Sequence, residues 1–188
     1  MSDSPEEFVA EQERLKKRPS RARYDKAHAL LERKWRRREL APDRMMREVV
    51  DVLWDIFAGS PYSWVGFYLL SGEGPSLVLG PHRDKPACSP LPMHGVCGQV
   101  ARSGVAMRVA DVGVLGAAHI VCDPRNASEI ALPVRDRAGK VWGVFDVDST
   151  QPAAFDDMDQ RWLETILKRF EQTNAPEPGH QRLGEASV

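Results

Sequence analysis

The sequence predicts an α+β domain in which an antiparallel sheet carries helices on one face and long loops on the other. Three observations support this prediction. Amphipathic segments frame a series of short apolar runs, two of these runs form an apparent hairpin, and about forty residues between the runs are broken by Pro and Gly. Helices that frame strands, rather than alternate with them, are typical of α+β domains. The long loops are expected to roof a pocket on the open face of the sheet.

An amphipathic helix is the first predicted element, from about residue 24 to residue 40. One helical face collects apolar residues that recur at intervals of three and four, namely Tyr24, Ala27, Leu31 and Trp35. Residues 1–22 are expected to be a charged, disordered start, and residues 23–41 a helical extension. For the basic residues 36–38, a solvated face or a dimer contact is favoured over nucleic-acid binding.

A second helix is predicted from Pro42, which suits the first turn of a helix, to about Gly59. Its apolar stripe consists of Met45, Val49, Val52, Leu53 and Ile56. Residues 63–70 and 76–80 follow as two predicted strands. Both are short runs, bounded by turns and rich in aromatic or branched apolar residues.

The next forty residues are irregular, because Pro and Gly residues prevent long elements, among them Pro81, Pro86, Pro90, Pro92, Gly95 and Gly98. Within this irregular segment we expect a short helix at residues 96–104 and a short strand at residues 106–111. Residues 128–136 and 140–149 are then predicted to form an antiparallel hairpin.

A final helix is predicted after Asp156, which suits the N-cap position. Its apolar face consists of Met158, Trp162, Leu163, Ile166, Leu167 and Phe170. The main domain is therefore expected to span residues 42–173, and residues 174–188 to form a disordered tail.

Composition argues against several function classes. The formal net charge of −1 argues against a protein whose main task is to wrap nucleic acid. No apolar run approaches the ~20 residues that span a bilayer, and the acidic start does not resemble a secretory signal. Three cysteines are an odd number and do not suit a secreted disulfide framework. We therefore expect a reducing compartment, with the protein in the cytoplasm.

Cys88, Cys97 and Cys122 are the residues that most strongly indicate chemistry, because all three fall in turn-rich segments. A nucleophilic cysteine must be a thiolate, which needs a cation, a helix N-terminus or a hydrogen-bond cage nearby. Cys122 has His119 three residues upstream and a possible helix start at Asp123-Pro124. For any single cysteine, buried structural filler is the alternative.

Three carboxylates are predicted to share one face of the hairpin. Asp146 and Asp148 lie two residues apart on one strand, and Glu129 on the partner strand can reach the same face. The neighbouring residues form no recognisable metal-ligand set, so no metal is predicted. A cationic amine is a suitable guest, and crowding can keep one carboxyl protonated as a general acid.

Nine segments in this order carry a family resemblance: WVGFYLL, LVLGP followed by KPAC, GVCG, HIVCD, SEI leading into LPV, and GVFDVDS before FDDMD. Over residues 63–170 the chain resembles the GAF-fold free methionine-(R)-sulfoxide reductases. This resemblance implies a six-stranded antiparallel sheet with helices on one side. It also implies reduction of the R epimer of free methionine sulfoxide.

The resemblance assigns roles to the cysteines. Cys122 would attack the sulfoxide sulfur and become a sulfenic acid. Cys88 would resolve it as a disulfide, and Cys97 either does so instead or relays the bridge. Thioredoxin would then reduce the disulfide by thiol exchange, so no cofactor is expected.

The same resemblance assigns roles around the pocket. Glu129, Asp146 and Asp148 would hold the substrate ammonium and protonate the sulfoxide oxygen. Backbone amides from Ile120 and Val121 to Cys122 would receive the oxygen or the substrate carboxylate. By strand alternation Trp64 and Tyr68 face the pocket and wall the substrate methyl group, with sheet-core packing as the equal alternative.

Two other functions are open from the sequence. Many GAF domains bind small molecules without catalysis, and here the N-terminal helices would then transmit a signal or mediate a homodimer. A redox-sensing regulator that binds nucleic acid through Arg36–Arg38 is the third and least favoured hypothesis. The reductase is favoured, because a pure sensor needs neither three thiols nor three carboxylates.

Overall fold

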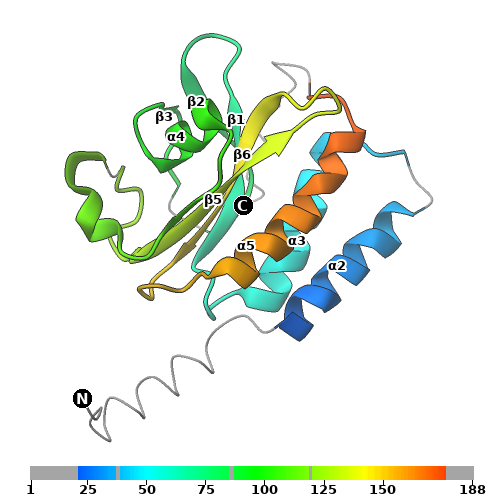
Figure 1. The fold of residues 1–188 in the computed structure, drawn as a ribbon, viewed down its shortest axis with the longest axis horizontal. Helices are drawn as coiled ribbons and strands as arrows, with labels where there is room; N and C mark the ends of the chain where they lie inside the picture. Colours follow the sequence, from blue (N-terminus) through cyan, green and yellow to red (C-terminus); the bar gives the residue numbers. More distant parts are fainter. Residues whose placement is uncertain (1–20, 37–38, 85–86, 119, 177–188) are drawn as a thin grey trace, which may run out of the picture.

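The computed structural model describes residues 21–36, 39–84, 87–118 and 120–176, which form a six-stranded sheet (Figure 1). The strands lie in the order β3-β2-β1-β6-β5-β4, and every neighbouring pair is antiparallel. Their bounds are β1 Trp64–Leu70, β2 Ser76–Arg83, β3 Leu91–Pro92, β4 Met107–Val109, β5 Ser128–Arg135 and β6 Val141–Ser149. The predicted α+β class is confirmed.

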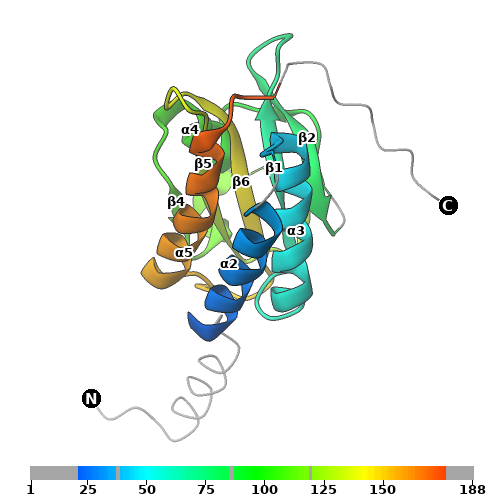
Figure 2. The same ribbon diagram turned by 90° about the vertical axis from the view of Figure 1, so that its right-hand side faces the viewer.

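Within the described residues, three long helices cover one face of the sheet and one short helix lies on the other (Figures 1 and 2). The covering helices are α2 Arg21–Trp35, α3 Pro42–Phe57 and α5 Asp157–Leu167. The short helix on the opposite face is α4 Val96–Ser103, and two 3-10 segments are η1 Val112–Ala118 and η2 Lys168–Gln172. The pocket face is therefore covered by a helix as well as by the predicted loops.

Strand alternation divides the interior into two apolar clusters. On β1, Val65 and Phe67 pack against the long helices, whereas Trp64 and Tyr68 face the opposite side. The helix-side cluster contains most of the fully buried aromatic residues and extends across β5, β6 and the three helices. The smaller cluster lies under α4 and surrounds Cys97. One sheet face thus supplies most of the core and leaves the other for a site.

The predicted hairpin is confirmed, with its turn held by one side chain. The Asp136 carboxylate accepts hydrogen bonds from the backbone amides of Ala138 and Lys140, at 2.9 and 3.0 Å. Gly139 adopts a positive φ of 77°, which a glycine reaches without steric cost. Next to this turn the pairing of β5 and β6 shifts by one residue, between Val134 and Arg135, and is regular from there to Ser128.

The N-terminus of α5 is also as predicted. Asp156 accepts from the backbone amides of Met158 and Asp159, and the Asp159 side chain accepts from the Asp156 amide. This reciprocal pair is a capping box, and it satisfies amide groups that a helix start leaves without partners.

Strand β2 extends beyond its predicted end at Gly80 and continues through Pro81 to Arg83. Proline cannot donate to a strand ladder, so it interrupts regular pairing. Here the register with β1 shifts between Gly66 and Tyr68, which leaves room for Pro81. The two-residue strand β3 was not predicted, since its length gives no periodic signal.

The helix predicted at residues 24–40 is α2, and its apolar side packs into the same core as α3 and α5. Tyr24 and Leu31 are fully buried, and the Tyr24 hydroxyl lies 3.0 Å from that of Tyr62. Trp35 donates to Glu48 on α3 at 2.7 Å. The predicted segments 1–22 and 174–188 lie mostly outside the described residues. No helix in the described part of the chain is long and apolar enough to cross a membrane.

We expect Leu31→Ala to lower the free energy of unfolding by about 2–5 kcal/mol, because it leaves a cavity in the shared core. Arg33→Ala, on the exposed side of the same helix, should change it by less than about 0.5 kcal/mol. Urea denaturation followed by circular dichroism measures both. Equal, small effects would show that α2 adds nothing to the stability of the domain.

Candidate active site

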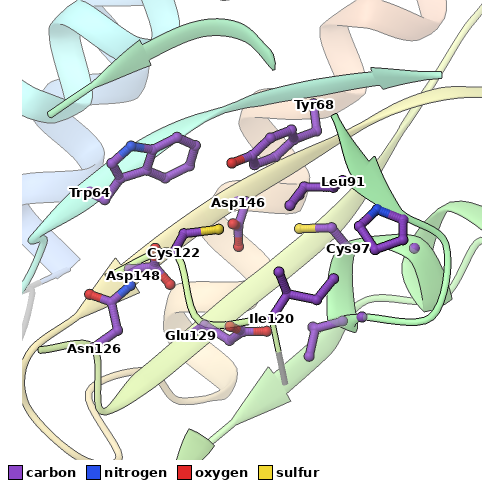
Figure 3. Close-up of a pocket in the computed structure, with 14 residues that line it drawn as sticks. Trp64, Tyr68, Leu91, Cys97, Ile120, Cys122, Asn126, Glu129, Asp146 and Asp148 are labelled. Carbon is purple, nitrogen blue, oxygen red and sulfur yellow. The ribbon is translucent and has the colours of Figure 1, made fainter. Parts of the chain in front are cut away.

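Three carboxylates meet on the sheet face that lies opposite the long helices. Glu129 on β5 pairs directly with Asp148 on β6, and Asp146 lies two residues before Asp148. Their neighbours Phe145 and Val147 point to the helix side. The predicted clustering of the three acids is therefore confirmed, and all three line one pocket (Figure 3).

Burial raises the pKa of each carboxyl. Desolvation is the main cause for Glu129, whose pKa rises to about 8, with the charge of Asp148 adding to it. The pKa of Asp148 rises to about 7, again mainly by desolvation, and a hydrogen bond from Asn126 opposes this rise. Burial and the charges of the other two acids raise the pKa of Asp146 well above its ordinary value. Protonated carboxyls are thus available near neutral pH.

Asp146 has an unused acceptor inside the pocket. Its Oδ1 atom is buried and has no hydrogen-bond partner among the described residues, while its carboxyl receives a bond from the Cys97 thiol. Buried polar atoms without a partner are rare in folded proteins. A donor on a bound ligand would satisfy this atom.

Cys88 and Cys122 form a disulfide, with their Cα atoms 5.4 Å apart. Both residues are partly exposed, and Cys122 lines the pocket. Cys97 is a free, buried thiol in the first turn of α4. In the view of Figure 3, the Asp146 carboxyl lies between the sulfur atoms of Cys122 and Cys97. The pocket therefore adjoins one redox pair and holds one separate thiol.

Burial strongly affects the remaining thiol. Desolvation, followed by the charges of Asp146 and Glu129, raises the pKa of Cys97 well above its ordinary value. Cys97 is therefore a protonated hydrogen-bond donor to Asp146 rather than a nucleophile.

The aromatic residues lie where strand alternation predicts. Trp64 and Tyr68 line the pocket, with ring centroids 5.6 Å apart and nearly parallel planes. The Tyr68 hydroxyl hydrogen-bonds the backbone of Cys88, so it links the sheet to the loop that carries the disulfide. They line the pocket and also belong to its apolar cluster, and their contact with a substrate methyl group stays a prediction.

The segment around Cys122 differs from expectation in one respect. Ile120 lines the pocket and Val121 is 60% exposed, and the role assigned to their backbone amides stays a prediction. The possible helix start at Asp123-Pro124 is wrong. Residues 123–126 form a turn instead, in which Asp123 accepts from the Arg125 amide at 2.9 Å. His119 lies outside the described residues.

Asn126 is a pocket residue that the sequence did not indicate. Its side-chain amide hydrogen-bonds Asp148, and its oxygen accepts from Ser63 at 3.3 Å. From the sequence it was notable only as part of a glycosylation-like tripeptide. Its role depends on a turn whose direction no local pattern reveals.

A GAF domain sequence profile matches residues 39–170. The free methionine-R-sulfoxide reductase of Escherichia coli is 40% identical over 114 residues, which are 60% of this chain and 67% of the relative. The chain belongs to the GAF-fold free methionine-(R)-sulfoxide reductase family. The resemblance stated from the motifs, and its fold, are confirmed.

Solved structures of the reductase family support the same assignment. The Neisseria meningitidis enzyme in complex with its substrate superposes with a TM-score of 0.72 at 31% identity, covering 81% of this chain and 90% of that one. The reduced form of the Staphylococcus aureus enzyme gives 0.69 at 33% identity, covering 81% and 94%. The comparison extends beyond the profile match to most of the described chain.

The pocket of this reductase-family member suits a small polar guest rather than a metal ion. Among the described residues, no group of three or more His, Cys, Asp and Glu side chains is arranged to hold a metal. In this disulfide form the pocket has about 40 Å³ of free volume, room for a few water molecules.

Glu129→Gln should make stability less dependent on pH. A carboxyl whose pKa is raised to about 8 on folding favours the folded state below its unfolded value near 4.5, and loses that contribution as pH rises towards 8. The wild type should therefore lose about 1–3 kcal/mol more than Glu129→Gln between pH 5 and pH 8. Urea denaturation of the wild type and of Glu129→Gln, both with the disulfide intact, measures this difference, with exposed Glu171→Gln as the matched control. Parallel pH curves for wild type and Glu129→Gln would contradict the assignment.

Iodoacetamide should distinguish the three cysteines in the folded, reduced protein. Cys88 and Cys122 should react at least about tenfold faster than Cys97, because Cys97 is buried and its pKa is raised. Peptide mass spectrometry measures each rate, and unfolding in urea should equalise them. Fast labelling of Cys97 in the folded protein would overturn its assignment as a buried donor.

Proposed function

We propose that this protein reduces free methionine (R)-sulfoxide to methionine, with Cys122 as the nucleophile and Cys88 as the resolving thiol. The observation that carries this proposal is the Cys88–Cys122 disulfide at the edge of a pocket lined by three buried carboxyls. Family membership supplies the substrate class. A pocket that joins a redox pair to acids suits reduction of a zwitterionic sulfoxide.

The reaction begins when the Cys122 sulfur attacks the sulfoxide sulfur. The sulfoxide oxygen takes up a proton as this sulfur–sulfur bond forms. The resulting hydroxyl group then moves to the Cys122 sulfur while the sulfur–oxygen and sulfur–sulfur bonds to the substrate break, so methionine leaves and Cys122 becomes a sulfenic acid. A protonated carboxyl must supply the proton that the developing hydroxyl needs. Glu129 and Asp146 are suited to this role because burial raises their pKa values.

Resolution follows between the two thiols that the structure joins. The Cys88 thiol attacks the sulfenic sulfur, water leaves, and the Cys88–Cys122 disulfide forms. Cys97 is buried and its pKa is raised, which disfavours it as the resolving thiol. Among the two alternatives open from the sequence, the geometry therefore supports Cys88.

The preference for a free amino acid follows from the charge of the pocket. No Lys, Arg or His occurs among the described residues that line it, so the three acids lack a cationic partner. A substrate α-ammonium group supplies that cation and the donor for Asp146 Oδ1. A residue within a peptide has no such ammonium group, and it would leave the acids without a counter-charge.

Thioredoxin is the proposed electron donor, and the cytoplasm the proposed location. The partly exposed disulfide is accessible to a dithiol protein, which would return both cysteines to thiols. A homodimer remains a prediction, and light scattering after size-exclusion chromatography tests it.

Reduced protein with thioredoxin, its reductase and NADPH should consume NADPH with the R epimer of free methionine sulfoxide and not with the S epimer. Cys122→Ser should abolish turnover. Cys88→Ser should lose thioredoxin-dependent turnover and still form about one methionine per protein in a single-turnover assay, since attack precedes resolution.

The unmodified, disulfide-containing protein without reductant is the control, and it should form no methionine. No turnover of either epimer by folded, reduced protein would reject the reductase proposal. Full thioredoxin-dependent turnover in Cys88→Ser would reject Cys88 as the resolving residue and reassign this role to Cys97.

A further inference from the structure

Asn126 bridges Ser63 and Asp148 within the pocket. The Ser63 hydroxyl donates to Asn126 Oδ1 at 3.3 Å, and the Asn126 amide hydrogen-bonds the Asp148 carboxyl. Figure 3 shows the amide nitrogen of Asn126 on the side of Asp148. The three side chains therefore form a short relay that ends on one of the three acids.

Backbone hydrogen bonds fix the segments that carry Ser63 and Asn126 to strand β6. The Ser63 amide donates to the Asp148 carbonyl at 2.9 Å, and the Ala127 amide donates to the Ser149 carbonyl at 2.8 Å. The backbone N–H of Asn126 closes the preceding turn by donating to the Asp123 carbonyl at 3.1 Å. Asn126 is thus held in place independently of any ligand.

The chemistry of the relay selects one protonation state of Asp148. A primary amide has one acceptor oxygen and one donor nitrogen. Because Ser63 donates to the oxygen, the nitrogen is left to donate towards Asp148. An ionised carboxylate only accepts, so it matches this donor better than a protonated carboxyl does.

We propose that Asn126 is a positioning residue that makes Asp148 the first of the three acids to ionise, and so divides the acid cluster into one anion for the substrate ammonium and two protonated acids. This inference rests on the proposed reductase function. It assigns different roles to residues that the sequence could treat only as one set. It also names Asn126 as the residue that determines which acid is the anion.

The groups around Asp148 support this division. Glu129 faces it from β5, Asp146 lies on its own strand, and Asp123 acts on it from the turn after Cys122. The charge of Asp123 opposes ionisation of Asp148, whereas Glu129 and Asp146 are neutral when protonated. The charge of Asp148 contributes to the raised pKa values of Tyr68 on β1 and Cys97 on α4, after burial as the main cause, and neither side chain supplies a cation.

Arg125, a cation in this turn, pairs with Asp123 rather than with Asp148. The Arg125 guanidinium lies 2.6 Å from the Asp123 carboxylate and is itself exposed. Asp148 is therefore stabilised as an anion by an amide rather than by a salt bridge. Its charge in turn raises the pKa of both Glu129 and Asp146, which holds protons on the two acids that the reaction needs.

Two isosteric variants test the proposal, Asn126→Leu and Asn126→Asp. Loss of the donor should raise the pKa of Asp148, so the acid limb of the kcat/KM profile should move upward by about one pH unit in Asn126→Leu. At neutral pH the variant should show an increase in KM of about tenfold, with a smaller change in kcat. Asn126→Asp should shift the limb further, because it places an acid against an acid.

Two further variants separate this effect from a general loss of structure. Ser63→Ala removes only the hydrogen bond from the Ser63 hydroxyl to Asn126. It should move the acid limb in the same direction as Asn126→Leu, but by a smaller amount. Asn174→Leu makes the same substitution at an exposed asparagine outside the pocket, and it should leave the profile unchanged. If kcat/KM of Asn126→Leu fell by the same factor at every pH and the acid limb of the profile did not move, the role of Asn126 would be merely structural and the proposal would be overturned.

Carbon-13 NMR of the Asp148 carboxyl, assigned with Asp148→Asn, provides a readout that does not need turnover. Its titration midpoint should rise in Asn126→Leu and Asn126→Asp in the disulfide form of the protein. An unchanged midpoint in the folded variants would reject the proposal whatever the activity. Absence of turnover in the wild type would instead reject the reductase function, and the NMR titration would still decide the role of Asn126.

Discussion

Glu129, Asp146 and Asp148 lie together on one buried sheet face, and no described Lys, Arg or His lines the pocket to balance them. Isolated buried charge is expensive, so such groups either gain a proton or gain a partner. The structure shows both solutions, since burial raises the pKa of all three acids and Asn126 supplies a donor to one. This single constraint explains both why the pocket suits a cationic group and why protonated carboxyls are available to the sulfoxide oxygen in the proposed reaction.

The same buried acids also make the cysteines differ in how readily they ionise. Cys97 is close enough to the acids to donate to Asp146, and their charge opposes its ionisation. Cys122 is partly exposed at the pocket edge and is already paired with Cys88. Acid clusters disfavour a neighbouring thiolate, so the thiol deepest among the acids is the least suited to attack. In the proposed mechanism the thiol chemistry therefore occurs at the edge of the pocket, and the acids inside orient and protonate the substrate.

Much of this arrangement follows from local sequence patterns. Periodicity predicted the helices and the hairpin, and the spacing of two between Asp146 and Asp148 predicted their shared face. Other features depend on contacts that no pattern encodes. Strand β2 passes through Pro81 because β1 shifts register there, and Asn126 enters the pocket because a turn folds on Asp123. The cysteine pairing needed the family resemblance, since spacing alone left Cys88 and Cys97 equal.

Stability and chemistry alternate along strand β6, where Phe145 and Val147 enter the helix-side core while Asp146 and Asp148 enter the pocket. A slip of one residue would exchange the two sets, placing carboxylates against α3 and α5 and aromatic surface in the pocket. The Asp136–Lys140 turn and the one-residue shift in pairing between Val134 and Arg135 together set the observed register. The large apolar core on the opposite face thus does more than offset the cost of the buried acids. Because only one register buries Phe145 and Val147, that core also fixes which residues face the substrate.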